Sequence, residues 1–511
     1  MRTTVALGLL CCVLAQGADA PARPLTLREA INRSLGHNLG LAVSRLEAAR
    51  AVDTLELAES GFDLRLSWVN RLGSARTLTE IAAGSPATDT FTSEVGLTQP
   101  FSWGGSLSLS GYTARDWLDS NGVPHDHDVS VGTALSYTQP LLRGGWQAVN
   151  LAPVVNARLG AGRSRLQFRS ATLDLIRDTE TAYWTLAAYR SLVSLRESSL
   201  RSAESLLAEV AERRRLGAAT VQEQLQAEAD IANQKVSVLG ARQQADAADT
   251  RVRSLLGLDA TADAPAEVAV ESLPQGQVEG IADYRAWLGS VLAFDLDAQV
   301  QQSLVESAQV ELEAARMNDQ PQLDLTVAGG VNGATGSFNR LNAALNALPN
   351  DHSWEASATL ALSFPLGFRE SEARVRIAQR TRRQADLRLA DVRQRLTFDA
   401  RATWRDLEAA RARLDAATAA LSLQRQVYEN ERARYSAGAS DIPRILQAQA
   451  SLDGAQLAWV GAMLDARVAS ARVARLDGTL LARHGFTWES AEQDVGSGVD
   501  ARDPLPELSR P

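Results

Sequence analysis

The residues of this chain that could do chemistry are few. His125-Asp126-His127-Asp128 alternates imidazole with carboxylate, a combination that can bind a divalent metal. It directly follows Asn121-Gly122-Val123-Pro124, which is typical of a turn, so we favour a solvated polar loop over a metal site. The 511 residues include five histidines and three methionines, and they contain no phosphate-binding loop ending in Gly-Lys, no His-Glu-x-x-His and no Gly-x-Ser-x-Gly. We therefore predict no enzymatic activity, no cofactor and no metal.

Two glycines stand at positions where the chain must reverse. Gly217 and Gly438 each interrupt a long helical pattern, and they lie 221 residues apart. Glycine accepts the positive φ that a sharp reversal after a helix requires. We predict that each glycine joins two long antiparallel helices, which makes the chain a tandem repeat of helical hairpins.

The helices themselves show a seven-residue period. Leu407, Leu414, Leu421, Tyr428 and Tyr435 follow one another in steps of seven, and the first half carries a similar stripe. This period is typical of helices that supercoil around partners. The pattern predicts helices over 148–216 and 368–436, each roughly 100 Å long if unbroken.

Each half also contains runs in which apolar and polar residues alternate. The apolar members of these runs are Phe62, Leu64, Leu66 and Trp68; Phe91, Val95, Leu97 and Phe101; Leu107 and Leu109; Val129, Val131, Leu135 and Tyr137; Leu323, Leu325 and Val327; and Trp354, Leu360, Leu362 and Phe364. Such alternation is the weak signal of a membrane β-barrel, but a water-soluble antiparallel sheet alternates as well. The fold class predicted from helices and strands together is mainly α with a β part.

The chain divides into five segments. Residues 1–20, which contain both cysteines, have the features of a secretory signal peptide. Residues 21–258 form the first repeat, 259–280 a linker, 281–486 the second repeat, and 487–511 an acidic tail that we expect to be disordered. The mature chain has no apolar run of the ~18 residues that a spanning helix needs. A net charge of −9 argues against a nucleic-acid partner.

The order of several short motifs resembles the TolC family of outer-membrane efflux and secretion channels, up to about residue 485. The resemblance rests on the order and spacing of segments that match the family. These segments are residues 25–30, Tyr137–Gly145, Ala182–Leu186, the turn Arg215–Thr220 with Leu225–Glu228, and its counterpart Tyr435–Gly438 with Leu446–Gln449. The family implies a homotrimer in outer-membrane lipid, with a periplasmic adaptor (membrane fusion protein) and an inner-membrane pump as partners. In such a trimer the helices form an α-barrel tunnel, and each chain contributes four strands to one transmembrane β-barrel of 12.

The function implied is passive export through the outer-membrane channel of a tripartite efflux or type I secretion system. The alternatives are a periplasmic coiled-coil adaptor or a structural protein without a membrane barrel. One departure concerns the strands, because up to four strand-like runs lie between Phe62 and Gly145 where the family has two. Either the barrel exceeds 12 strands, or one hairpin folds outside it as a surface loop.

The resemblance also assigns site residues. Gly217, Ala218, Gly438 and Ala439 match the turns that form the periplasmic rim of the tunnel and touch the adaptor. At the entrance, Tyr435 matches a constricting tyrosine and Glu223 matches its acidic partner. Two positions that are acidic in the best-known members are Arg444 and Gln447 here, which leaves Asp441 as the nearby acid. We therefore expect the pore to be lined at its entrance by Glu223, Tyr435, Asp441, Arg444 and Gln447. We do not expect cations to block this entrance as they block family members that have two rings of acidic residues.

Overall fold

A computed structural model describes residues 24–76, 87–120, 123–124, 128–258, 268–273, 276, 278–335 and 352–488. The predicted signal peptide, nearly all of the predicted tail and residues 125–127 of the His-Asp alternation lie outside this part. The described chain is mostly helical with one β-sheet, which confirms the predicted fold class. No helix within it is both long and apolar enough to cross a bilayer.

The helices follow the predicted order. They are α1 (Leu27–His37), α2 (Leu39–Glu59), a 3-10 turn (Ser60–Phe62), α3 (Gln147–Arg215), α4 (Val221–Leu255), α5 (Tyr284–Phe294), α6 (Leu296–Met317), α8 (Arg369–Ser436), α9 (Ile442–Leu476) and α10 (Leu480–Arg483). The two longest, α3 and α8, have 69 and 68 residues and begin and end within one residue of the predicted bounds.

The chain forms two compact units, and each takes residues from both halves of the sequence. One unit comprises residues 1–43, 171–295 and 397–511, and the other comprises residues 44–170 and 296–396. The first is helical and contains both Gly turns, whereas the second contains the sheet. These compact units do not follow the two predicted repeats. The division of the sequence into tandem repeats stays a prediction.

The helical unit is held together by the predicted stripes. Leu173, Ile176 and Leu186 of α3 are fully buried, and Leu407 and Leu414 of α8 are buried as well. Burying each such side chain contributes roughly 1.5–3 kcal/mol. The predicted burial of the seven-residue stripes is therefore confirmed for these positions.

Part of the predicted linker also packs onto this unit. Val270 forms a parallel bridge with Leu25, and the Glu271 N–H donates to the hydroxyl of Tyr183 at 3.0 Å. The same hydroxyl donates to the Leu25 carbonyl at 2.8 Å, and burial raises the pKa of Tyr183 to about 12. Tyr183 thus ties the start of the chain and the inter-repeat segment to α3.

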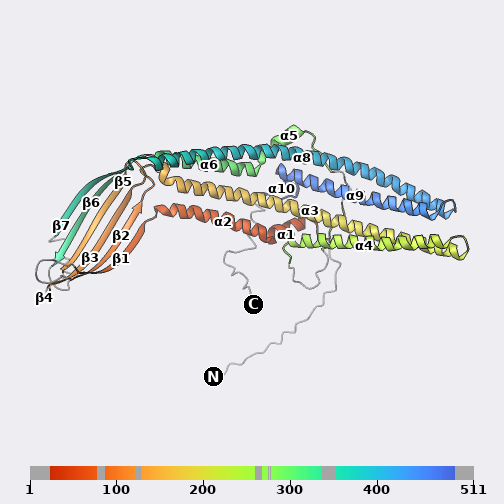
Figure 1. Cartoon of the computed structure of the whole chain (residues 1–511), viewed down its shortest axis with the longest axis horizontal. Coiled ribbons are helices and arrows are strands. Elements are labelled where there is room, and N and C mark those ends of the chain that lie inside the picture. Colours follow the sequence, from red (N-terminus) through yellow and green to blue (C-terminus); the bar gives the residue numbers. More distant parts are fainter. Residues whose placement is uncertain are drawn as a thin grey trace, which may run out of the picture. The chain divides into compact units, whose positions relative to one another are not determined.

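The sheet unit contains more strands than the family resemblance implies. Its strands are β1 (Arg65–Arg76), β2 (Ala87–Pro100), β3 (Ser106–Ser120), the two-residue β4 (Val123–Pro124), β5 (Asp128–Pro140), β6 (Gln322–Thr335) and β7 (Ser353–Ser363). The order is β1-β2-β3-β5-β6-β7 with every pair antiparallel, and β4 pairs only with the end of β3 (Figure 1). The expectation of a hairpin folded outside the sheet as a surface loop is wrong, because β2 and β3 lie in its interior.

The register gives this sheet two different faces. Leu66, Leu97, Leu109 and Leu135 lie side by side on four neighbouring strands, on what we call the apolar face. The next row belongs to the opposite, polar face and holds Ser67, Gly96, Ser110, Ala134, Gly330 and Glu355. The alternation read from the sequence therefore sorts side chains consistently across all six long strands.

The sheet joins its helices through a glycine turn. Gly144, at φ +82°, follows β5 and donates its N–H to the side chain of Asn318 at 3.1 Å. Its carbonyl accepts from the Asn150 side chain in the first turn of α3 at 2.8 Å. These bonds satisfy backbone groups where the strand ends and the helix begins.

Candidate functional site

The two helical hairpins end in turns of the same design. At the end of α3 the Ala218 N–H donates to the Arg213 carbonyl at 2.7 Å, and at the end of α8 the Ala439 N–H donates to the Arg434 carbonyl at 2.8 Å. The glycines between, Gly217 and Gly438, have φ of +72° and +74°. This is the Schellman motif, which satisfies the last carbonyls of a helix through a residue in the left-handed region. The predicted reversals at both glycines are confirmed.

The helix that follows each turn begins with a side-chain cap. Thr220 and Glu223 form a capping box at the start of α4, with Glu223 accepting from the Thr220 N–H at 2.6 Å. Asp441 caps α9, and its carboxylate accepts from the Arg444 N–H at 3.2 Å. The caps, like the glycines, lie 221 residues apart. Two of the predicted pore residues, Glu223 and Asp441, therefore have a structural role as caps.

A small apolar cluster joins the two hairpins beside these turns. We call it the tip cluster, and it consists of Val210 on α3, Tyr435 on α8, and Ile442 and Ile445 on α9. Tyr435 is only 4% exposed in the single chain. Burial raises the pKa of its hydroxyl, although the nearby charge of Arg213 opposes the shift. The tyrosine is thus part of a packed contact between α3 and the second hairpin.

Arg213 holds this contact from above the ring. Its guanidinium carbon lies 4.3 Å from the centre of the Tyr435 ring, which is the geometry of a cation–π contact. One of its nitrogens donates to the Tyr435 carbonyl at 3.0 Å and to Glu209 at 2.8 Å. Sequence reasoning missed this residue, and its signal was only the basic last turn of α3, which suits a helix C-terminus in any protein.

The other predicted residues of the turns lie on the surface of the single chain. Gly217, Ala218, Gly438, Ala439, Arg444 and Gln447 are all at least partly exposed. Asp441 and Arg444 form an ion pair, with 3.6 Å between an Asp441 oxygen and the Arg444 Nε. Both side chains are more than half exposed, so the pair adds little to stability, but it brings opposite charges together.

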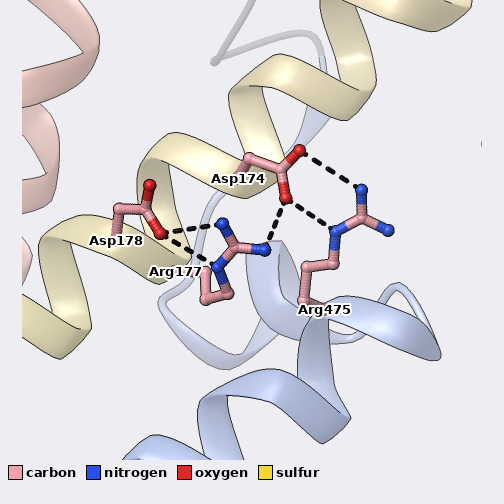
Figure 2. Close-up of polar contacts among 4 residues, drawn as sticks. All are labelled: Asp174, Arg177, Asp178 and Arg475. Carbon is pink, nitrogen blue, oxygen red and sulfur yellow. Dashed lines mark hydrogen bonds and ion pairs between the residues drawn. The ribbon is translucent and has the colours of Figure 1, made fainter. Parts of the chain in front are cut away.

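Further along the hairpins, two polar contacts join α3 to α9 and lie outside the sequence prediction. Figure 2 shows Asp174 of α3 accepting from Arg475 of α9 and from Arg177 of its own helix, at 2.9 and 2.8 Å. Asp178 accepts from the same Arg177, also at 2.8 Å. Nothing in the sequence pairs Asp174 with Arg475, because 301 residues separate them.

The second contact is buried. Asp453 of α9 accepts from Ser199 of α3 at 2.7 Å and from Gln234 of α4 at 3.1 Å. Burial and the Asp453 charge together raise the pKa of the neighbouring Asp230. Because a buried carboxylate is costly without such partners, this group fixes how α9 lies against the first hairpin.

Part of the chain matches a known protein family. Residues 287–479 match the family model described as outer membrane efflux protein. No curated protein matches the chain.

Several solved structures share the fold. The outer-membrane channel CmeC of Campylobacter jejuni is 16% identical, with a TM-score of 0.67, covering 93% of this chain and 90% of that one. CusC is 15% identical, with a TM-score of 0.67 and coverage of 88% and 91%. The open-state MtrE channel of Neisseria gonorrhoeae is 17% identical, with a TM-score of 0.61 and coverage of 88% of each chain. At these identities the likeness shows that the fold is shared.

The first prediction tests the contact made by Arg213. Replacing Arg213 by alanine removes its hydrogen bond to the Tyr435 carbonyl and the cation–π contact, so the tip should open locally more often. We expect amide hydrogen exchange over 435–445 to become about tenfold faster, which corresponds to a loss of ~1.4 kcal/mol. Mass spectrometry of the exchanged protein measures this directly.

The neighbouring Arg214 provides the control. Its guanidinium bonds Gln224 across the first turn and carries the same charge. Arg214→Ala should leave exchange over 435–445 unchanged. If exchange over 435–445 became equally fast in both variants, the loss of charge in the turn, and not the contact with Tyr435, would determine the stability of this segment.

Proposed function

We propose that this chain is the outer-membrane channel of a tripartite efflux or type I secretion system. The premise is that residues 287–479 match the outer membrane efflux protein family and that the chain as a whole shares the fold of the solved efflux channels. Proteins of this family are outer-membrane proteins with a periplasmic tunnel. In the proposed function the channel is passive, and an inner-membrane pump drives the cargo into it.

The two faces of the sheet carry this proposal. On the apolar face, Leu66, Leu109 and Leu135 are 47–70% exposed in the single chain, and Trp68 and Trp354 are exposed as well. Val129 and Val131, at the far end of β5 on the same face, are buried. Monomeric soluble proteins rarely expose so many large apolar side chains on one face. The polar face holds the charged residues Arg65, Arg71, Glu94, Asp116, Asp324 and Glu355. Lipid on one side and water on the other would satisfy both faces.

The charges of the apolar face are consistent with that placement. Asp89 and Arg115 are directed to this face by the register, and both lie toward the strand ends farthest from the helices. Charges are tolerated near an interface and are costly at the bilayer centre. Outer-membrane lipid is therefore the partner that we propose for this face.

The turns of the hairpins support contact with a periplasmic adaptor. Gly217, Ala218, Gly438 and Ala439 are exposed, and Leu216 beside the first turn is 67% exposed. An exposed leucine next to a rigid, well-capped turn is a suitable contact for an apolar group of another protein. We propose that these residues form the rim onto which the adaptor docks.

The alternative of a soluble adaptor is less well supported. Adaptors carry a separate small domain within a single helical hairpin, whereas here the α3–α4 and α8–α9 turns span only 216–220 and 437–441. A secreted coiled-coil structural protein would not explain the apolar face of the sheet.

The proposal as a whole predicts a trimer that requires detergent. The full-length protein should fractionate with outer membranes, be extracted only by detergent, and have the mass of three chains by light scattering. Reconstituted in a planar bilayer, it should conduct ions. A monodisperse water-soluble monomer, or a trimer without conductance, would contradict the proposed function.

A further prediction concerns the rim. Gly438→Val places a β-branched residue at φ +74°, which costs roughly 1–2 kcal/mol, although the space around the glycine is open. The trimer should persist because the buried stripes hold it, but the altered turn should lower adaptor binding and export severalfold.

Gly454→Val in α9 is the matched control. This glycine has no positive φ and no atom within 4 Å of an added Cβ, so export should be normal. Normal export by Gly438→Val would remove the second turn from the docking rim.

The last prediction of the proposed function concerns ion selectivity at the entrance. With three chains, the paired charges of Asp441 and Arg444 largely cancel beyond the Debye length of about 8 Å at physiological salt. We expect weak ion selectivity and little block by trivalent cations. Arg444→Asp should make the channel cation-selective and sensitive to that block, with Arg444→Gln intermediate. Reversal potentials and conductance in planar bilayers measure both effects, and strong block of the unaltered channel would mean that other residues line the pore.

A further inference from the structure

The extra strands are full members of the sheet. β2 pairs along its whole length with β1, from Arg65↔Thr98 to Arg76↔Ala87, and also with β3, from Ala87↔Asp119 to Pro100↔Ser106. β3 pairs in turn with β5 from Ser106 to Asp116. Both strands therefore have a paired neighbour on each side, so they are not a hairpin folded on the surface of a four-stranded sheet.

The end of β2 is built like the end of β5. Thr98-Gln99-Pro100 is followed by Gly104-Gly105, and Thr138-Gln139-Pro140 by Gly144-Gly145, at a spacing of 40 residues. In each case the glutamine side chain donates to the carbonyl of the proline after it, at 3.0 and 2.9 Å. Gly104 and Gly144 both have positive φ, +88° and +82°. The two strand ends thus share sequence, hydrogen bonding and backbone conformation.

The two strand ends lead into different elements. Gly144-Gly145 continues into α3, whereas Gly104-Gly105 continues directly into β3. The tight turn is packed in place, because a Cβ on Gly104 would lie 2.2 Å from the Gly144 carbonyl oxygen. Six strand ends therefore meet only four helices, namely α2, α3, α6 and α8, at this edge of the sheet (Figure 1).

The added strands also continue both faces. On the apolar face, Leu97 and Leu109 fill the row between Leu66 and Leu135. On the polar face, Gly96 and Ser110 lie between Ser67 and Ala134. β2 and β3 therefore fit between lipid and water as well as the other four strands do.

The edges of the sheet indicate the partner. Among the described strands, β1 pairs only with β2 and β7 pairs only with β6, so each leaves one row of backbone groups unpaired. Because the six strands alternate in direction, β1 and β7 are antiparallel to each other. The β7 edge of one copy can thus pair with the β1 edge of the next, and apolar side chains then continue on one side.

We propose that three copies of this chain close a β-barrel of 18 strands, six from each. The inference rests on the proposed trimeric channel and concerns its width. Strands about 4.8 Å apart and tilted by about 40° give 18 strands a backbone diameter of about 36 Å, against about 24 Å for 12 strands. With side chains of about 5 Å on the inner face, the lumen is about 25 Å wide.

The width of the proposed barrel indicates which class of cargo can pass through it. The polar face is lined largely by glycine, alanine, serine and threonine, as in the row Gly96, Ser110, Ala134 and Gly330. Such a lumen passes bulky hydrated molecules, such as polymer chains with their water shell, without forming the narrowest point of the route. Two copies closing a 12-stranded barrel is the competing assembly.

Electron cryomicroscopy of the detergent-extracted protein tests the strand number directly. A cross-section through the sheet region should show 18 strands in a trimer. A trimeric channel with 12 strands would overturn this inference and leave the proposed function intact. A dimer with 12 strands would overturn it as well, and a protein that forms no channel would instead contradict the proposed function.

A deletion variant tests the width. Removing residues 87–120 takes out β2 and β3 and allows Leu66 of β1 to lie opposite Leu135 of β5, which preserves both faces. The largest polyethylene glycol that enters the barrel from the side away from the helices, measured by its effect on conductance, should be about 12 Å smaller in diameter for the variant. An unchanged size limit in a folded, conducting variant would overturn the inference.

Engineered cysteines test the edge pairing without changing the strand number. Because both native cysteines, Cys11 and Cys12, lie at the start of the chain, Ser67→Cys on β1 can be combined with Ser357→Cys, Thr359→Cys or Ala361→Cys on β7, all on the polar face. Oxidation of at least one combination should give covalent trimers on a denaturing gel, whereas Ser67→Cys alone should not. Products that stop at two chains in every combination would overturn the three-copy closure.

Discussion

Backbone hydrogen bonding at the two edges of the sheet is the constraint on which the rest of this protein depends. A sheet with one apolar face can be stable in lipid only when no backbone N–H or C=O is left without a partner. β1 and β7 each have an unpaired edge within the described part of the chain, and in the proposed assembly another copy of the chain supplies the partner. The proposed trimer, the lipid contact and the channel all follow from that requirement.

The helical unit solves a different problem, which is how to hold long helices in one register. Apolar stripes alone allow a helix to slide by one heptad, because the pattern repeats. Here the buried Asp453, bonded by Ser199 and Gln234, and the partly buried pair of Asp174 and Arg475 each fit only one register. In a shifted register these polar groups would be left without partners, and the resulting loss of stability disfavours registers shifted by one heptad.

The two halves of the sequence resemble each other more in their helical turns than in their strands. The two Gly turns keep the same Schellman geometry and the same cap position, although Thr220 and Asp441 are different residues. The strands have not kept such symmetry, since four long strands come from the first half and two from the second. A helical hairpin tip must keep its shape, whereas a sheet can accept an additional antiparallel pair wherever both faces continue through it.

By itself the sequence determined the local structure, since local patterns depend on neighbouring residues. The seven-residue stripes predicted α3 and α8 to within one residue, Gly217 and Gly438 predicted the reversals, and alternation predicted all six long strands. Only the tertiary structure decided that β2 and β3 join the sheet, because strand pairing depends on residues far apart in the chain. It also brought Arg213 onto Tyr435, across 222 residues, and placed a residue matched to a pore constriction in a buried contact within the single chain. Such contacts depend on how helices pack, and the sequence of one helix does not indicate which residues of a distant helix lie against it.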